Sequence, residues 1–153
     1  MSVAFGSVLG IASSTCLELF KDNRRNRSTR TQIASLVSVV QMQMHDAAKS
    51  GAAPSAQWIS IELLSARVFS SDAAAVLRGK GALMFHTRAV ELHQIRLGIE
   101  SLQMKWDDLK LAMAQGEFRD TGPALHAGLA RDITTMAGRG ETICGTMLKI
   151  LDQ

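Results

Sequence analysis

The sequence is poor in the residues that mark β-rich or disulfide-stabilised proteins. Its 153 residues include no tyrosine, two prolines and two cysteines. Because Cys16 and Cys144 lie far apart in the sequence, they form no disulfide framework, and a reducing compartment such as the cytoplasm is the expected location. No stretch sustains the alternation of apolar and polar residues that is typical of a half-buried strand. The common residues are Ala, Leu, Met, Ser and Gln, and this composition favours an all-α fold.

The sequence also lacks the short motifs of common catalytic and nucleotide-binding sites. It has no P-loop, no glycine fingerprint for dinucleotides and no Gly-x-Ser-x-Gly elbow. His86, His93, Glu100 and Asp107 share one heptad position, but neighbours in this series would lie about 10.5 Å apart along a helix. That spacing is too wide for one metal ion. We therefore predict no catalytic residue, no metal site, no cofactor and no enzymatic activity.

Residues 1–17 carry no charged side chain, and a cluster of basic residues follows soon after them. Residues 1–30 carry five basic and two acidic side chains, whereas residues 31–153 carry twelve of each sign, so the net charge of +3 belongs to the N-terminal part. The basic cluster has no interleaved aromatic residues, and we expect no nucleic-acid partner. The cluster is either a solvated linker or a site of attraction to anionic lipid. The candidate lipid-attracting residues are Lys21, Arg24, Arg25 and Arg27.

The uncharged N-terminal segment carries small residues at a regular spacing. Ser2, Gly6, Gly10 and Ser14 recur every four residues, which on a helix forms a groove that lets another helix approach closely, as in a glycine zipper. Three interpretations stay open: the segment spans a membrane, enters a membrane conditionally, or is buried against the rest of the protein. The side chains that would insert into a membrane are Val3, Phe5, Val8, Leu9 and Ile11.

The rest of the sequence predicts a bundle of about four helices with short connections. Ser28 or Thr29 can cap the first of them, and Pro123 lies in the first turn of the last one. In that last helix Gly140 occupies an apolar heptad position and belongs to a Gly-Arg-Gly sequence that would allow a kink. The expected helices cover about 30–50, 56–77, 82–115 and 121 onward, with breaks at 51–54, 79–81 and 116–120. We divide the chain into an apolar leader helix (1–20), a basic linker (21–30) and the helical bundle (31–153).

The longest expected helix, over 82–115, carries apolar residues on two opposite sides. The first stripe follows a/d heptad steps and is interrupted only by Arg88. A second row repeats every seven residues, about 140° to 160° around the helix from the first. One packing partner cannot cover both sides, so we predict that the second row is an oligomer face or a second packing face. The first stripe contains Phe85, Leu92, Ile95, Ile99, Leu102, Trp106, Leu109 and Met113, and the second row contains Leu83, Val90, Leu97, Met104 and Leu111.

The first twenty residues, MSVAFGSVLGIASSTCLELF, resemble the N-terminus of fungal HeLo and HeLo-like domains, the helical bundles of HET-S-type cell-death proteins. The resemblance implies that this helix leaves the bundle and enters a membrane as the protein oligomerises. The shared features are Met1-Ser2, Phe5-Gly6, Val8, Gly10 and the uncharged run with spaced glycines.

Two functional hypotheses follow from these patterns. The first is a non-enzymatic, self-associating helical bundle that targets or perturbs membranes through its N-terminal helix, in the manner of pore-forming or cell-death proteins. The alternative is a soluble helical-bundle adaptor or structural assembly subunit, with the N-terminal helix buried in its core or in a subunit interface. A homo-oligomer in the cytoplasm is expected, and the first hypothesis adds an anionic membrane surface as a partner.

Overall fold

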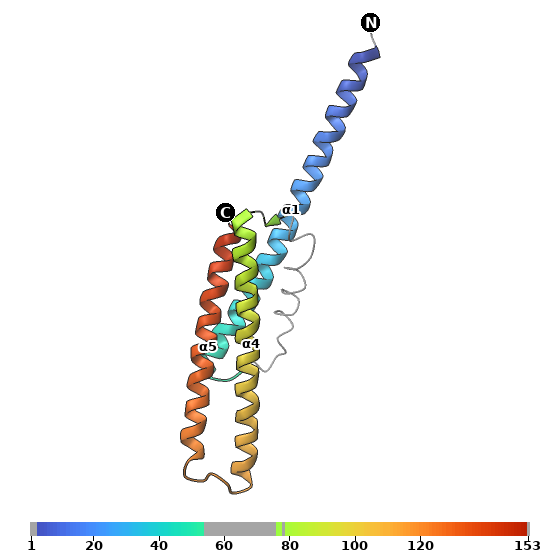
Figure 1. Ribbon diagram of the computed structural model, residues 1–153. Coiled ribbons are helices and arrows are strands. Elements are labelled where there is room, and N and C mark those ends of the chain that lie inside the picture. Colours follow the sequence, from blue (N-terminus) through green and yellow to red (C-terminus); the bar gives the residue numbers. More distant parts are fainter. Residues whose placement is uncertain (1–2, 54–75, 78, 153) are drawn as a thin grey trace.

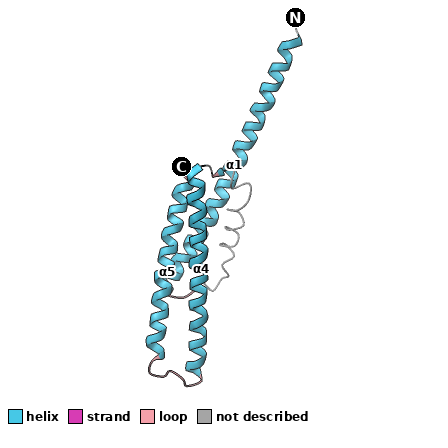
Figure 2. Cartoon of the chain, viewed as in Figure 1, coloured by secondary structure: helices cyan, strands magenta, loops and turns pink. Residues whose placement is uncertain are grey.

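The computed structural model describes residues 3–53, 76–77 and 79–152, and the side chains of residues 3–20, 22 and 23 lie outside this description. The described chain is all-helical, as predicted (Figure 2). It contains α1 (Val3–Ser50), α4 (Gly79–Ala114) and α5 (Gly122–Leu151), and no strand occurs in these ranges. The predicted count of about four helices with an additional N-terminal helix is therefore not confirmed. The helix expected over 56–77 lies outside the described residues except for its buried end, Val76 and Leu77.

The first helix differs from the expected arrangement, because α1 runs without interruption through the basic residues 21–30. No linker separates residues 3–20 from residues 31–50, and neither Ser28 nor Thr29 begins a new helix. Residues 11–50 contain no Gly or Pro, and Arg and Lys are good helix formers, so no local signal is strong enough to end the helix. The Thr31 hydroxyl donates to the Arg27 carbonyl at 3.0 Å, a bond that belongs to a helix interior. In Figure 1, α1 extends past the ends of α4 and α5.

The ends of the helices follow the predicted turn residues. Gly51 adopts a left-handed conformation (φ 64°) and its N–H donates to the Ala47 carbonyl at 2.9 Å, which ends α1. Gly116, which also has a positive φ (90°), lies just after the end of α4, in the turn that leads to α5. The start of α4 differs slightly from the prediction, because Gly79–Gly81 form its first turn instead of a break before it. Helix α5 continues through Gly138–Gly140, although the Gly-Arg-Gly sequence there would allow a kink.

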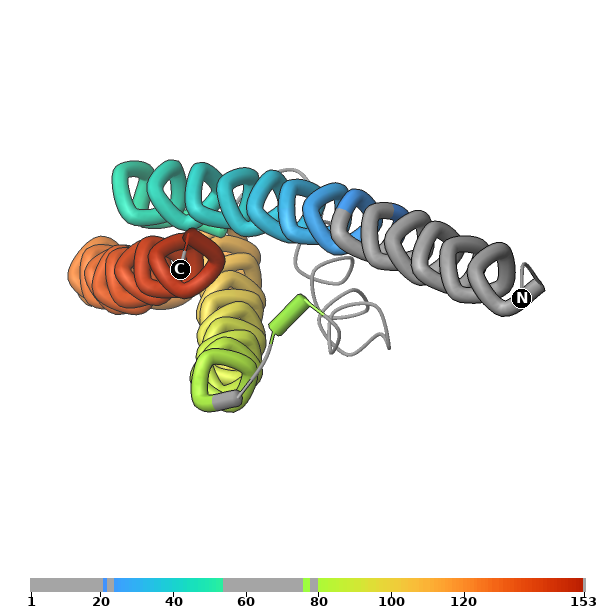
Figure 3. Tube along the Cα trace, turned by 90° about the horizontal axis from the view of Figure 1, so that it is seen from above, coloured from blue at the N-terminus to red at the C-terminus, as the bar shows by residue number. Residues whose placement is uncertain are grey.

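Helix α5 packs against both α1 and α4, and the three helices enclose one core (Figures 1 and 3). Their inward stripes recur at helical spacing, because each helix must bury one apolar side. The predicted a/d stripe of α4 faces this core, where Phe85 and Ile99 are fully buried. The buried core includes Ile33, Val37, Val40 and Met44 of α1, Phe85, Leu92, Ile95 and Ile99 of α4, and Ile133, Ile143, Cys144, Met147 and Leu151 of α5.

The lower parts of α4 and α5 continue as a hairpin beyond the C-terminal end of α1 (Figure 1). The apolar residues of α4 in this hairpin, among them Leu109 and Met113, are half-buried, since only two helices cover them. The half-buried Trp106 ring stacks on the His126 ring, with centroids 3.6 Å apart and planes at 26°. This stacked pair holds the two helices together where α1 no longer covers them.

Candidate interaction surfaces

The main candidate surface is the side of α4 that points away from the core. All five members of the predicted second row are exposed there, with exposed fractions between 43% and 72%. Successive members lie about 10.5 Å apart along the helix, so the row extends over about 42 Å. Such a continuous line of large apolar side chains differs from the single exposed apolar residues that are normal on protein surfaces. We call Leu83, Val90, Leu97, Met104 and Leu111 the α4 outer row.

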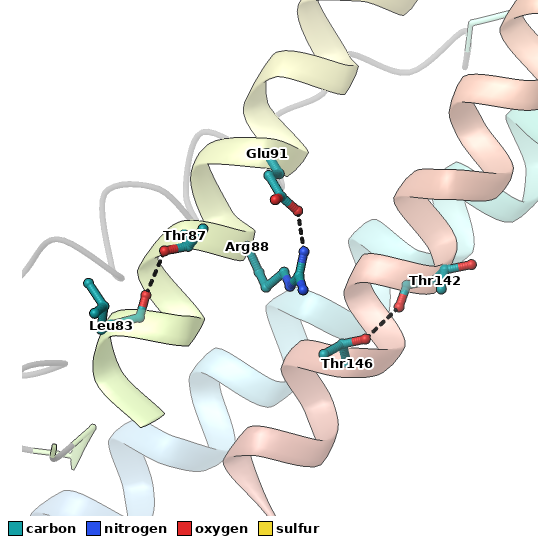
Figure 4. A network of polar contacts seen from close by, with 6 residues as sticks. All are labelled: Leu83, Thr87, Arg88, Glu91, Thr142 and Thr146. Atoms are coloured by element: carbon teal, nitrogen blue, oxygen red, sulfur yellow. Dashed lines mark hydrogen bonds and ion pairs between the residues drawn. The ribbon is translucent and has the colours of Figure 1, made fainter. Parts of the chain in front are cut away.

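Polar residues flank the α4 outer row on both sides. The half-buried His86, His93 and Glu100 and the exposed Asp107 follow the row members at a spacing of three residues. The residues at a spacing of four are short or polar and exposed: Thr87, Gln94, Ser101 and Asp108. The Thr87 hydroxyl donates to the carbonyl of Leu83 at 2.9 Å, on the side of α4 that is turned away from α5 (Figure 4).

The acidic members of this flank have neighbours on their own helix. Gln103 Nε2 donates to Asp107 Oδ1 at 3.1 Å, and Arg96 Nε lies 3.7 Å from Glu100 Oε1. Both carboxylates are at least partly accessible to solvent. These contacts stay within one helix. The carboxylates therefore remain accessible to a partner that covers the row.

Arg88, which interrupts the inward stripe of α4, is accommodated by a local ion pair. Its Nη1 atom lies 2.6 Å from Glu91 Oε2, and both side chains are about one third exposed. Figure 4 shows this pair on the side of α4 that faces α5. The adjacent Ala89 takes the buried position instead. Because the guanidinium of Arg88 has this carboxylate partner, it lies at the edge of the core without being buried as an unpaired charge.

The second candidate surface is the basic cluster of α1. Lys21, Arg24, Arg25 and Arg27 are all exposed. At about 100° per residue, they centre on the side of α1 opposite to its buried stripe, which begins at Ile33. The cluster is therefore directed to solvent and lies on the same continuous helix as the apolar segment.

The predicted membrane-inserting and helix-packing residues cannot be placed as side chains. Residues 3–14 form part of the helical backbone of α1, but nothing is described of the side chains of Val3, Phe5, Val8, Leu9, Ile11 and Ser14 or of the surroundings of Gly6 and Gly10. Ser2 lies outside the described backbone. Over the described residues, no helix has the length and apolarity that crossing a membrane requires.

Two shallow hollows between α4 and α5 were not predicted from the sequence. One, of about 380 Å³, lies beside Gly98 and Met136, and the other, of about 410 Å³, lies between Leu109 and Leu125. Asp132 lines both. No motif signals them, because they depend on how α4 and α5 are placed against each other.

Among the side chains that the structure describes, one free thiol occurs, and it belongs to Cys144 in the core. Burial raises the pKa of this thiol to about 12, the negative charge of Glu141 acts in the same direction, and a backbone hydrogen bond acts against them. Such a thiol stays protonated at neutral pH and is a poor nucleophile. Within the same described ranges, no three His, Cys, Asp or Glu side chains converge as metal ligands would.

One ionisable pair connects two helices. His45 Nδ1 of α1 lies 3.2 Å from Glu141 Oε1 of α5, and both side chains are partly exposed. The pair lies at the edge of the α1–α5 interface and contributes to its alignment.

Comparison with known proteins adds no assignment: no protein-family model, no curated protein and no solved structure matches this chain.

Proposed function

We propose that this chain is a non-enzymatic helical module that assembles with copies of itself through the α4 outer row and binds anionic membranes through the N-terminal part of α1. The single observation that carries the proposal is the exposure of the complete α4 outer row. The basic cluster on the outward side of α1 supports the membrane part.

The energetics of the α4 outer row favour association. The exposed fractions of its members together amount to about three whole apolar side chains. Burying the row of one copy contributes on the order of 4–9 kcal/mol, and a contact between two copies buries two such rows. The loss of translational and rotational freedom, together with the ordering of side chains, offsets a large part of this gain. A weak to moderate self-association that depends on protein concentration is the expected behaviour.

The membrane part of the proposal is based on the electrostatics of α1. A basic residue near an anionic lipid surface contributes about 1 kcal/mol, so the four exposed residues of the cluster supply several kcal/mol at low salt. The cluster continues directly into the uncharged segment of α1 without a flexible joint. The resemblance of residues 1–20 to HeLo-type domains agrees with this arrangement.

The second candidate function is an assembly subunit whose N-terminal helix lies in a subunit interface and never meets lipid. The exposed α4 outer row supports this candidate as well as the first one. The row lies on a different helix from the basic cluster, so a contact between copies through the row does not require lipid. The two candidates differ in whether lipid binding occurs at all.

Flotation with vesicles that contain phosphatidylserine tests the membrane part. The wild-type chain is expected to float with the vesicles at low salt and to be released as salt increases. A variant with Lys21, Arg24, Arg25 and Arg27 replaced by Gln is expected to lose binding. The matched control replaces four exposed basic residues that lie away from both surfaces, Lys49, Arg119, Arg131 and Arg139, by Gln and is expected to retain it. Equal loss in both variants, or no flotation of the wild type, would reject membrane targeting by α1.

Size measurements on variants test the self-association part. Val90→Glu with Leu97→Glu places two charges in the α4 outer row and is expected to prevent association while leaving the helical circular dichroism unchanged. Val39→Glu with Met42→Glu makes the same change at exposed apolar residues of α1 and is the matched control. If both double variants associate like the wild type, the α4 outer row is not the contact.

A further inference from the structure

We infer that the self-association is a two-fold contact in which α4 of a second copy lies antiparallel along the α4 outer row, with Leu97 at the symmetry axis. This inference rests on the proposed function, because it requires that copies of the chain associate through this row. It goes further by specifying the orientation and the register of the partner helix.

The apolar residues of the row permit this symmetry. Val90 and Met104 lie seven residues to either side of Leu97, and Leu83 and Leu111 lie fourteen residues to either side. In an isologous two-fold contact each residue meets its symmetry counterpart reciprocally. An antiparallel pair centred on Leu97 therefore aligns Leu83 with Leu111 and Val90 with Met104, and it covers the whole row in both copies.

The row alone does not choose between parallel and antiparallel partners, but its charged flanks do. The flanks of the N-terminal half carry His86, His93 and, in the first turn, the exposed Lys80. Those of the C-terminal half carry Glu100, Asp107 and Asp108, with the exposed Lys105 and Lys110 as opposing charges beside the row. The row thus has a donor-bearing and basic end and an acidic end.

An antiparallel pair brings these unlike ends together at matching heights. His86 lies about 16.5 Å from the level of Leu97 in one direction, and Asp107, on the same flank of the row, lies about 15 Å from it in the other, at the helical rise. Likewise His93 lies at the level of the partner's Ser101, one residue from Glu100. An imidazole donates a hydrogen bond to a carboxylate in either of its charge states.

A parallel pair has the opposite consequence. It would place Asp107 and Asp108 of both copies side by side, together with both Glu100 side chains, and like charges at such distances are destabilising. The short side chains Thr87 and Ser101, which belong to the flank at a spacing of four residues, let the backbones approach in either orientation. The charge distribution therefore selects the antiparallel partner.

Cysteine cross-linking between two differently tagged variants tests the orientation. Both variants carry Cys16→Ser and Cys144→Ala to remove the native thiols, and one adds Leu83→Cys while the other adds Leu111→Cys. Mixing and oxidation are expected to give mainly the mixed product that joins positions 83 and 111. A variant in which Leu97→Cys is the only added cysteine is expected to form a disulfide between the two positions 97 of the pair, because Leu97 lies on the symmetry axis.

The outcomes separate this inference from the proposed function. If Leu83→Cys and Leu111→Cys each link mainly to themselves, the helices are parallel and the inference is wrong, while self-association through the row stands. If the protein associates in a row-dependent way but positions 83, 97 and 111 give no cross-link, the register is wrong and the function stands. If the wild-type chain does not associate, both fail.

A charge exchange provides a second, independent readout. Asp107→Lys with Asp108→Lys is expected to weaken dimerisation by about tenfold, since two symmetry-related contacts are lost. Adding His86→Glu to this variant restores unlike pairs and is expected to recover most of the loss. A recovery is expected only for the antiparallel arrangement, and its absence would overturn the assignment.

Discussion

Gly140 and Gly98 offer opposite tests of how tightly the three helices pack. Both glycines lie inside helices, where replacing Gly by Ala contributes about 0.8–1 kcal/mol through helix propensity alone. A Cβ atom at position 140 would lie 2.7 Å from Sδ, 3.1 Å from Cγ and 3.2 Å from Cε of Met44. Ordinary carbon contacts are about 3.5–4.0 Å, and Met44 is fully buried, so it cannot move away freely.

The expected effect of Gly140→Ala is therefore a net destabilisation. Overpacking of a core costs about 1–3 kcal/mol, which exceeds the gain in propensity and leaves a loss of about 1 kcal/mol. For a chain of this size the loss corresponds to a fall in Tm of about 2–4 °C. At position 98 the added Cβ would overlap the terminal methyl group of Met136, a half-buried side chain beside a hollow of about 380 Å³. That methyl group can turn into the hollow, so Gly98→Ala is expected to raise Tm.

Thermal unfolding of both variants by circular dichroism measures these effects. Combining Gly140→Ala with Met44→Ala tests the cause, because removing the crowded side chain is expected to abolish the penalty of the alanine. A rise in Tm for Gly140→Ala equal to that of Gly98→Ala would refute the proposed close approach of α1 and α5 at this point.

Three further predictions concern single features of the core and its edges. The folded-state pKa of Cys144, about 12, lies above the ordinary thiol value of 9.0, so its contribution to stability is complete below pH 9 and is lost as the pH rises towards 12. The free energy of unfolding should therefore fall between pH 9 and pH 12 in the wild type, and it should fall less in Cys144→Ala. An equal fall in both proteins would contradict the assignment. Trp106→Ala should destabilise the hairpin by about 2 kcal/mol, because two helices alone hold this region together. Amide hydrogen exchange should increase more over residues 102–132 than in the parts of α4 and α5 that lie beside α1. An equal increase in both regions would contradict the lower stability of the hairpin. His45→Ala should change the free energy of unfolding in urea by about 0.5 kcal/mol or less, since His45 and Glu141 are partly exposed, and a loss of several kcal/mol would show that this pair is essential to the α1–α5 interface.

The sequence predicted the helix class and the two-sided nature of α4 because both are consequences of local periodicity. The stripe with Phe85 and Ile99 is buried, and the row with Leu83 and Leu111 is exposed, as a single-sided packing arrangement requires. The capping residues before position 30 were misleading, because a Ser or Thr begins a helix only where the preceding residues leave the helical conformation. Nothing in residues 11–50 forces them to do so.

Pairings between helices could not be predicted from one sequence. The contact of Met44 with Gly140 depends on which helices are neighbours and on their relative height, and neither is encoded in the period of one segment. Gly140 at an apolar heptad position was a signal of close approach, but it did not identify the partner helix. The hollows beside Asp132 likewise depend on how α4 and α5 are placed against each other.

Sedimentation equilibrium of the wild-type chain over a wide range of concentrations tests the central claim most directly. If the α4 outer row is a contact between copies, the mass is expected to rise with concentration from that of one 16.5 kDa chain to twice that value. A constant mass of one chain up to the limit of solubility would show that the exposed row does not bring copies together, and the account of this protein as a self-assembling module would be wrong.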